Sequence, residues 1–385
     1  MSALSLRLPA ARPDTAFITS AVLLLTIGLI MVGSASVAVA DRALDEPLYY
    51  FYKQAIYAVI GLGAGFAVLH IPMRQWQANS FPLLAVALIM LFVVLMPGIG
   101  REVNGARRWI DMGAFAMQVS EPARLFLIMY LAGYAVRRQV ELRTTFGGLI
   151  RPILPITLAC LLLLMEPDYG AATILLMVCG LMLFLAGARL LHLLVLGGAA
   201  VFVLAMAALS SPYRVARLVS FADPWEHPYA SGFQLTQSLI AIGRGEIGGV
   251  GLGNSVQKLL YLPETHTDFI FAIFAEEFGL IGAILLIGLF GLLVWRAYAI
   301  AKNAIAAGQW FGAFVAYGLS SWLALQAFVN ISVNMGILPT KGLTLPLVSY
   351  GGSSLVVTCV LIALLLRVDL ESRAANAPKT TGRAR

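Results

Sequence analysis

Charged side chains are scarce in this sequence. Asp, Glu, Lys and Arg make up only 12% of its 385 residues, whereas 60% are hydrophobic. A soluble domain carries about 25% charged residues, so this chain has too few solvated groups to cover a surface in water. Long apolar runs recur along the whole chain, which indicates one membrane-embedded domain and excludes a soluble domain with a single anchor.

Cysteines are rare, and nucleotide-binding motifs are missing. The three cysteines lie inside apolar runs, where they are small buried hydrophobes and imply no disulfide framework. No P-loop is present, and the GxGxxG match at residues 243–248 lacks the strand and βαβ unit of a dinucleotide site. We therefore expect no nucleotide site, and we interpret residues 243–254 as a glycine-rich outer loop.

Ten segments have the character of membrane-spanning helices, for which about 20 apolar residues are needed. Two of them, 119–136 and 153–165, are shorter or carry charges. The predicted spans are residues 17–40, 50–69, 81–96, 119–136, 153–165, 170–188, 190–209, 269–295, 311–333 and 347–366. The expected fold class is an all-α polytopic membrane protein with about 10 transmembrane helices.

The basic residues predict the orientation of these spans. With both termini inside, the cytoplasmic segments hold 15 of the 26 Lys and Arg residues but only 4 of the 19 Asp and Glu residues. This distribution is the positive-inside bias of membrane proteins. It accounts for the net charge of +7, so the charge does not indicate a nucleic-acid partner. We expect a cytoplasmic tail at 1–16, a single transmembrane domain at 17–367 and a cytoplasmic tail at 368–385.

The longest connection, residues 210–267, lies between spans 7 and 8 on the extracytoplasmic side. It is too long for a plain linker. Its apolar residues at 233, 239, 240 and 242 fall on one helical face, so we expect a short interfacial helix there.

Ionisable residues at the ends of spans are the functional candidates, because charge is costly in a membrane. Glu264, His266 and Asp268 lie within five residues where the long loop enters the eighth span. An aspartate at this point either caps the helix or takes part in chemistry. No HxxxH or repeated acidic pattern accompanies these residues, so we assign no metal ligands.

Three further charged groups lie on the same outer side. Arg107 and Arg108 form either an interfacial anchor or a phosphate clamp, since the guanidinium fork matches phosphate oxygens. Glu121 and Arg124 are spaced i, i+3, so they either pair with each other or face a cavity. Asp168 stands in a tight turn, where capping of the next helix is the alternative to a functional role.

Residues 338–354 contain two prolines, three glycines and many hydroxyl side chains beside the last span. Non-helical backbone at membrane depth is tolerated only where it is buried or lines a cavity. The segment holds one cation, Lys341, and also Ser349 and Tyr350. Its composition predicts a cavity-lining segment and no specific reaction.

These motifs together resemble the SEDS family (shape, elongation, division and sporulation proteins), over nearly the whole chain up to Asp369. The resemblance is carried by residues 104–109, 120–122, 167–168, 253–258, 266–270 and 339–354. Pro339-Thr-Lys-Gly342 looks like the division branch of the family, since the elongation branch usually lacks that lysine. The chain departs from the family pattern at Val119, which replaces a proline, and at Arg124, which replaces a lysine. A role that needs a titrating lysine at 124 is therefore not expected.

The resemblance implies a peptidoglycan glycosyltransferase in the bacterial inner membrane at the division septum. Its substrate would be lipid II, a disaccharide-peptide on undecaprenyl pyrophosphate, polymerised into β-1,4 glycan on the outer face. Implied partners are a class B penicillin-binding protein transpeptidase, the FtsQ–FtsL–FtsB complex and FtsN. A lipid II flippase and a non-catalytic division scaffold are the alternatives.

The family's essential catalytic residue matches Asp268, which would take a proton from the attacking sugar hydroxyl, with His266 orienting or shielding it. The cations expected to stabilise the leaving pyrophosphate, alone or with a divalent magnesium or manganese ion, are Arg107, Arg108, Arg124 and Lys341. The remaining expected substrate contacts are Glu121, Asp168, Ser349 and Tyr350.

Overall fold

The computed structural model describes residues 12–376 except 104, 112, 114–115, 210–214, 216–218, 227, 229–231 and 260. Most of the two predicted tails, residues 1–11 and 377–385, and part of the predicted outer loop lie outside the described residues. The helices are α1 (Thr15–Leu44), α2 (Tyr49–Leu69), α3 (Met73–Ala78), α4 (Ser80–Val93), α5 (Ser120–Arg137), α6 (Gln139–Thr144), α7 (Phe146–Met165), α8 (Tyr169–Leu185), α9 (Leu190–Leu209), α11 (Phe233–Arg244), α12 (Ile270–Ala306), α13 (Trp310–Asn334) and α14 (Gly352–Asn376).

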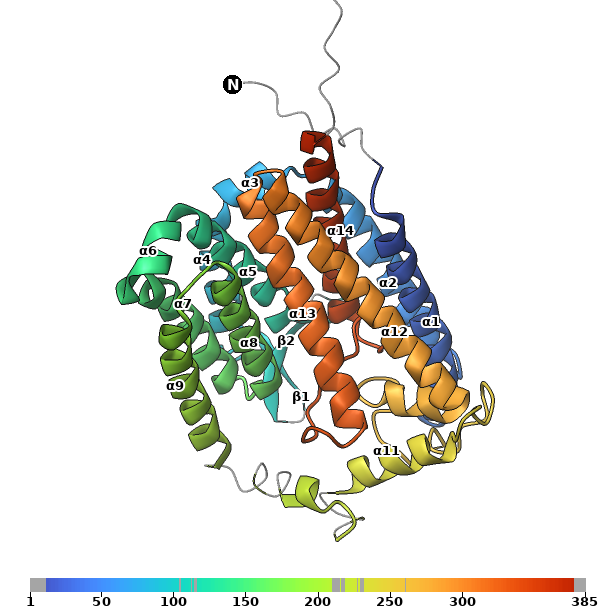
Figure 1. Ribbon diagram of the computed structural model, residues 1–385. Coiled ribbons are helices and arrows are strands. Elements are labelled where there is room, and N and C mark those ends of the chain that lie inside the picture. Colours follow the sequence, from blue (N-terminus) through green and yellow to red (C-terminus); the bar gives the residue numbers. More distant parts are fainter. Residues whose placement is uncertain are drawn as a thin grey trace, which may run out of the picture.

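A helix occupies each of the ten predicted spans, and the chain is a polytopic helical membrane protein (Figure 1). Six of the described helices, α1, α2, α7, α12, α13 and α14, are long and apolar enough to cross a membrane, and α4, α8 and α9 are shorter apolar helices. A short helix, α11, is present where the sequence predicted one in the long loop.

Several helix bounds differ from the predictions, most of them at the ends of α7, α12 and α14: α12 extends to Ala306 and α14 to Asn376. The fifth span is a full helix of 20 residues, because the side chain of Thr145 accepts from the amide of Gly148 and starts α7 well before residue 153. Pro152 and Pro155 lie within this helix. The last helix begins only at Gly352, and residues 338–351 before it are not helical.

The all-α expectation misses a small antiparallel sheet that joins α4 to α5. Its strands are β1 (Gly100–Val103), β2 (Ala106–Asp111) and β3 (Ala116–Gln118), in the order β1-β2-β3. The turn from β1 to β2 contains Gly105, whose φ of 74° is a conformation that glycine adopts without strain. The sheet packs beside the start of α14, where the amide of Gln118 donates to Ser353 Oγ over 3.2 Å.

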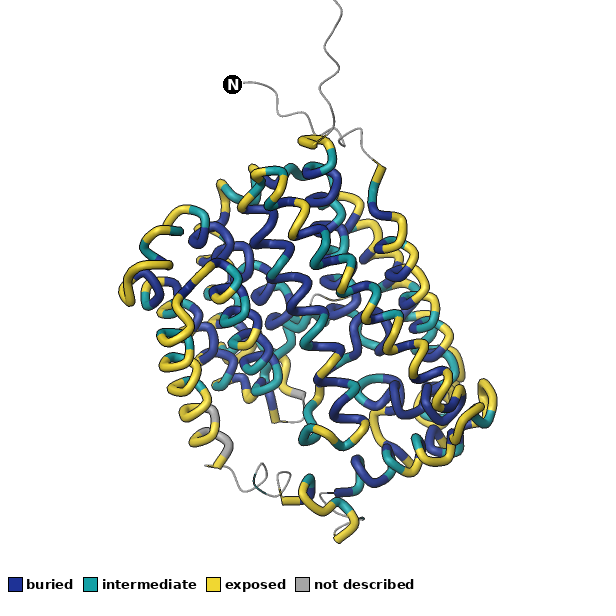
Figure 2. Tube along the Cα trace, viewed as in Figure 1, coloured by how far each residue is buried: buried dark blue, intermediate teal, exposed yellow. Residues whose placement is uncertain are grey.

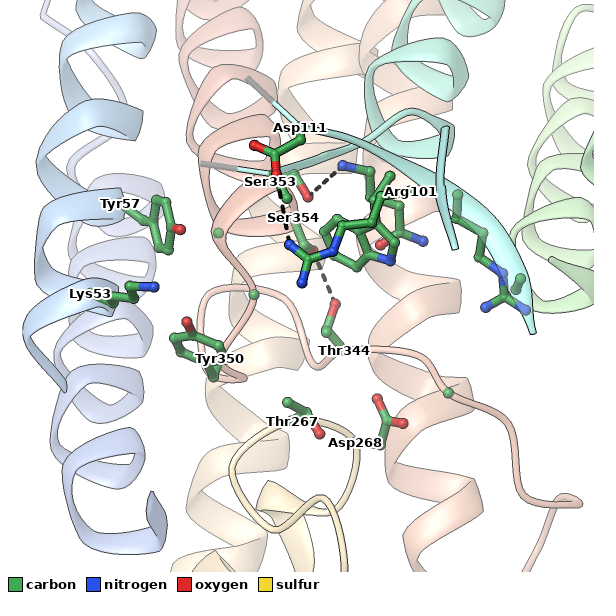
Figure 3. A pocket seen from close by; sticks show the side chains of 18 of the residues that line it. Lys53, Tyr57, Arg101, Asp111, Thr267, Asp268, Thr344, Tyr350, Ser353 and Ser354 are labelled. Carbon is green, nitrogen blue, oxygen red and sulfur yellow. Dashed lines mark hydrogen bonds and ion pairs between the residues drawn. The ribbon is translucent and has the colours of Figure 1, made fainter. Parts of the chain in front are cut away.

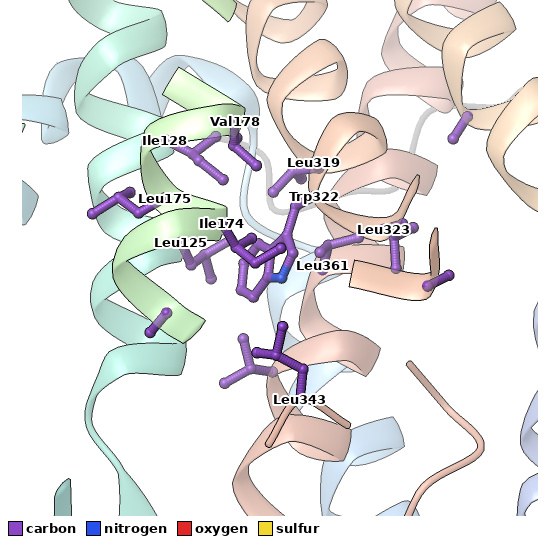
Figure 4. Close-up of a cluster of buried hydrophobic side chains, with 14 of the residues drawn as sticks. Leu125, Ile128, Ile174, Leu175, Val178, Leu319, Trp322, Leu323, Leu343 and Leu361 are labelled. Carbon is purple, nitrogen blue, oxygen red and sulfur yellow. The ribbon is translucent and has the colours of Figure 1, made fainter. Parts of the chain in front are cut away.

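The hydrophobic core lies where α5, α8, α13 and α14 meet. Trp322 of α13, 2% exposed, is surrounded there by branched side chains (Figure 4). Figure 2 shows α13 and α14 largely buried, whereas α9 is mostly exposed. The exposed side chains of α9 are apolar, among them Leu191 and Phe202, as a lipid-facing helix requires.

An ion cluster joins the two ends of the described chain. Asp14, which caps α1, accepts from Arg296 and Arg373, and its own amide donates to Asp369 over 2.8 Å. The start of α1 and the end of α14 therefore lie at the same end of the bundle (Figure 1), as an even number of crossings requires.

A second buried ion cluster anchors the glycine-rich loop on α12. The helix is broken at Gly279, whose φ is 66°, and the amides of Val250 and Gly251 pair with the carbonyls of Glu276 and Glu277 at 3.0 Å. Lys258 Nζ donates to Glu277 over 2.8 Å, between side chains that are 9% and 0% exposed. Residues 245–254 thus form a loop fixed on α12, and the GxGxxG match follows a helix, α11, rather than a strand.

We predict that Lys258→Ala strongly destabilises the protein. Removing one partner of a buried ion pair leaves the other charge without compensation, which costs about 3–5 kcal/mol. The measurement is the melting temperature of the purified protein in detergent. Arg151→Ala is the control, since Arg151 pairs with Glu141 at the surface, and exposed pairs contribute about 0–1 kcal/mol. Equal losses in the two variants would contradict a buried role for Lys258.

Candidate active site

A cavity of about 620 Å³ opens at the end of the bundle that carries the sheet and α11. The start of α2, the sheet, the loop before α12 and the segment before α14 enclose it (Figure 3). Its lining residues are Lys53, Tyr57, Arg101, Ala106, Arg108, Trp109, Asp111, Gly113, Ala116, Gln118, Glu264, Thr267, Asp268, Gly342, Thr344, Tyr350, Gly351, Gly352, Ser353 and Ser354.

The cavity has acidic and basic groups from distant parts of the sequence. Figure 3 shows Thr267 and Asp268 on one side and Arg101 on the opposite side, with Lys53 at the edge. Arg101 is paired with Asp111 across the strands at 3.8 Å. Such a space places a carboxylate and several cations around one bound molecule, which is the arrangement that a phosphate-bearing substrate requires.

Asp268 stands at the end of the long loop, just before α12, and this part of the loop forms a wall of the cavity. Its carboxylate is beside Gly342, where an added Cβ would stand 3.1 Å from Oδ2. Its main-chain carbonyl accepts from the side-chain amides of Asn330 and Asn334, each at 2.9 Å. The aspartate is therefore held through its backbone while its side chain faces the cavity.

Residues 338–351, which we call the strap, are fixed to the loop that carries Asp268. The hydroxyl of Ser349 donates to the carbonyl of Thr267 over 2.6 Å and accepts from the amide of Leu345 over 2.7 Å. The amide of Tyr350 donates to the carbonyl of His266 over 2.8 Å. Tyr350 lines the cavity, whereas Ser349 is buried behind it and joins two backbone segments.

His266 packs behind the cavity against two aromatic rings that also contact each other. Its ring centroid is 4.6 Å from that of Tyr50 and 5.5 Å from that of Tyr350. Burial lowers the pKa of His266, so the imidazole is neutral at pH 7. His266 is not among the lining residues, and its place beside Tyr350 supports the cavity wall.

The two adjacent arginines of β2 have different surroundings. Arg108 lines the cavity and donates to the carbonyls of Glu166 and Pro167 over 3.1 and 2.6 Å. Arg107 pairs instead with Glu102 over 3.1 Å and is not a lining residue. Successive side chains of a strand point to opposite faces, which separates the pair.

The other expected contacts lie outside the cavity lining. Asp168 caps α8 by accepting from Ala171 and also accepts from Gln118, which does line the cavity. Arg124, 2% exposed, stands over the Trp322 ring at 4.6 Å and is 3.9 Å from Glu121.

Lys341 reaches toward α8, where Nζ is 3.4 Å from Thr173 Oγ1, and burial lowers its pKa. The structure thus places Asp268, Arg108 and Tyr350 at one cavity and the remaining candidates around or behind it.

The sequence interpretation did not identify Lys53 and Gln118 as site residues. Lys53 was detectable, because it is a cation inside a predicted span, and such residues are functional candidates by default. Gln118 gives no signal in the sequence, since only the pairing of β3 with β2 brings it to the cavity. Arg101 stands in an outer segment where the orienting bias disfavours arginine, which is a weak signal.

A protein-only metal site does not form among the residues that the structure describes. No group of three or more His, Cys, Asp or Glu side chains there is suited to hold a metal ion. Three acidic residues, Asp111, Glu264 and Asp268, line the cavity, and Asp111 is paired with Arg101.

The fold and the cavity define a polytopic membrane protein with a charged site at one end of its helical bundle. The chain belongs to the cell cycle protein family that comprises FtsW, RodA and SpoVE, whose model matches residues 14–374.

Relatives and solved structures agree with this membership. The chain is 51% identical to "Probable peptidoglycan glycosyltransferase FtsW" of Thioalkalivibrio sulfidiphilus, and the match covers 97% of this chain and 93% of that protein. It is 52% identical to the protein of the same name from Nitrosococcus halophilus, and that match covers 94% of this chain and 93% of the relative. A chain of a peptidoglycan synthase complex superposes with a TM-score of 0.77, and Thermus thermophilus RodA with 0.70. Both are 29% identical and are matched over 94% of this chain and 98% of theirs.

We predict a pH-dependent stability that arises from Glu166. Burial, together with the nearby Asp168, raises the pKa of this carboxyl to about 8, against the opposing effect of Arg108. Its carboxylate oxygens have no hydrogen-bond partner among the described residues. The folded protein therefore holds this proton more tightly than the unfolded chain, and the resulting stability is lost as pH rises from about 4.5 through about 8.

The measurement is the melting temperature between pH 5 and pH 8.5. We expect the wild-type value to fall across this range more steeply than that of Glu166→Gln, which keeps the shape and removes the titration. Glu141→Gln, at an exposed surface pair, is the control and should follow the wild type. Parallel curves for wild type and Glu166→Gln would show that this carboxyl is already ionised in the folded protein.

Proposed function

We propose that this chain is a peptidoglycan glycosyltransferase that polymerises lipid II into β-1,4 glycan strands during septal wall synthesis. The observation that carries the proposal is the cavity in which Asp268 stands opposite Arg101 and near Arg108 and Lys53. The names of the relatives support the activity, and their FtsW designation supports the role in division.

The proposed topology has ten spans with both termini in the cytoplasm of a bacterial cell. In this arrangement the ion cluster of Asp14 lies inside, and the cavity and residues 210–267 lie on the outer face. The positive-inside distribution and the position of both chain ends at one end of the bundle support it. The domains then follow as a tail at 1–16, one membrane domain at 17–367 and a tail at 368–385.

Asp268 acts as general base in the proposed reaction. The hydroxyl of one sugar attacks the anomeric carbon of a second sugar, and the Asp268 carboxylate takes the hydroxyl proton as the new bond forms. The bond from the anomeric carbon to the pyrophosphate oxygen breaks on the opposite face. Such a displacement inverts the configuration, so an α-linked donor gives a β-linked glycan.

The cations of the cavity stabilise the leaving pyrophosphate. Negative charge accumulates on the phosphate oxygens as the glycosidic bond breaks, and preorganised arginines lower the energy of that state. Arg108 is held in place by two backbone carbonyls, and Arg101 and Lys53 complete the basic side. The pyrophosphate linkage supplies the driving force, so the reaction needs no nucleoside triphosphate.

The proposed partners are a class B penicillin-binding protein, the FtsQ–FtsL–FtsB complex and FtsN. Support comes from the solved peptidoglycan synthase complex to which the chain is similar. We expect the chain alone to polymerise poorly and the transpeptidase to activate it.

A lipid II flippase is the alternative from another class of protein. A flippase binds its cargo near the middle of the membrane, commonly at broken helices of repeated halves. The lining charges of this chain instead gather at one end of the bundle, which favours the enzyme. A scaffold without activity would not depend on Asp268.

We predict that Asp268→Ala abolishes polymerisation. Purified protein with its transpeptidase partner is incubated with fluorescent lipid II in detergent, where no membrane has to be crossed, and the glycan products are separated by size. Loss of the general base lowers the rate by about 10²–10⁴-fold. Asp41→Ala, an exposed acid at the end of α1, is the control and should retain the wild-type rate. Unchanged polymer from Asp268→Ala would remove this site, and no polymer from the wild type would favour the flippase or the scaffold.

A further inference from the structure

The backbone at the start of α12 is bridged by a side chain from another helix. The Ala272 amide is shared between the Phe269 carbonyl and Asn334 Oδ1, each at 3.1 Å. Asn334 Nδ2 in turn donates to the Asp268 carbonyl over 2.9 Å. The side chain of Asn334 thus bridges the Ala272 amide and the Asp268 carbonyl.

A second amide completes the coordination of the same carbonyl. Asn330, one turn before Asn334 on α13, donates from Nδ2 to the Asp268 carbonyl over 2.9 Å and to the Leu343 carbonyl over 2.5 Å. A carbonyl oxygen has two lone pairs, and side-chain donors from α13 occupy both. Asn330 and Asn334 are 2% and 0% exposed, so these bonds form away from competing water.

These bonds determine where the Asp268 carboxylate points. α12 begins at Ile270 with Phe269 as its N-cap, so residue 268 lies outside the helix. Without the two asparagines the Asp268 carbonyl would lose both of these donors, and the backbone that carries the carboxylate would be free to turn. The carboxylate would then leave its place beside Gly342 at the cavity.

Asn330 also helps to fix the distance between the two walls that meet at Asp268. Its one nitrogen bonds Asp268 on the loop and Leu343 on the strap, next to Gly342. Asn330 therefore joins the loop and the strap directly at the carboxylate, in addition to the bonds of Ser349 to Thr267 and of Tyr350 to His266.

We propose that Asn334 and Asn330 are positioning residues for the catalytic carboxylate and that they act by holding the Asp268 backbone through its carbonyl. This inference rests on the proposed function, because it assigns Asp268 as the base. Neither asparagine lines the cavity, so neither contacts substrate.

The test is the steady-state kinetics of lipid II polymerisation by the complex with its transpeptidase partner. In Asn334→Leu, the side chain keeps its branched shape and its number of heavy atoms but can neither accept from Ala272 nor donate to Asp268. We expect kcat to fall by about 10–100-fold, as for a displacement of roughly 1 Å, with KM for lipid II within about twofold of wild type. Asn334→Asp keeps the acceptor and the size but loses the donor, and it should also lose kcat.

Controls separate positioning from general damage to the fold. Ser320→Ala removes a buried hydroxyl of α13 that bonds only Ala316 within its own helix, and it should keep wild-type kcat and KM. Asp268→Ala is measured alongside, and adding Asn334→Leu to it should cause no further loss, because both changes act on one group.

Three results would overturn the inference. One is a wild-type kcat in Asn334→Leu and Asn334→Asp, and another is a loss of activity that appears only in KM. The third is a loss that adds to that of Asp268→Ala. If Asp268→Ala itself polymerises normally, the catalytic assignment fails first, so failure of the proposed function is distinguishable from failure of the positioning role.

Discussion

The buried amides of α13 are the interaction on which the site depends. In a membrane, backbone that is not helical must find its hydrogen bonds inside the protein. The loop before α12 and the strap before α14 both contain such backbone, and they meet at Asp268. Gln326, Asn330 and Asn334, spaced four residues apart on one face of α13, donate to Thr344, Leu343 and Asp268. One helix thus satisfies both irregular segments and fixes their relative position.

This requirement explains why polar side chains lie in the centre of an apolar bundle. Each amide of α13 is at most 2% exposed, and an unpaired group at that depth would cost several kcal/mol. Gln326 also accepts from Arg124, so the buried arginine that stands over Trp322 belongs to the same network. Asp268 is consequently held by a largely buried helix of the fold.

Sequence reasoning succeeds where the signal is local and fails where it depends on pairing. Hydrophobic length located a helix in every predicted span. Asp268 could be identified as a candidate at a span end, and Arg108 as a candidate in an outer loop. The separation of Arg107 from Arg108 follows from the register of a three-stranded sheet, whose strands are too short for a clear pattern. The role of Asn334 requires contact with Asp268, 66 residues away, and no spacing in the sequence indicates it.

The charged groups of the cavity differ in how firmly they are held. Asp268 is fixed by two buried amides and Arg108 by two backbone carbonyls, whereas Arg101 and Asp111 pair across exposed strands, with side chains 61% and 54% exposed. Proton transfer requires a base at a fixed distance from the hydroxyl, so the fixed position of Asp268 suits its proposed role. In the same proposed reaction the cavity must release pyrophosphate in every cycle, and an exposed, solvated cation such as Arg101 binds phosphate less tightly than a buried one. The cavity therefore combines a preorganised base and a preorganised arginine with one exposed cation.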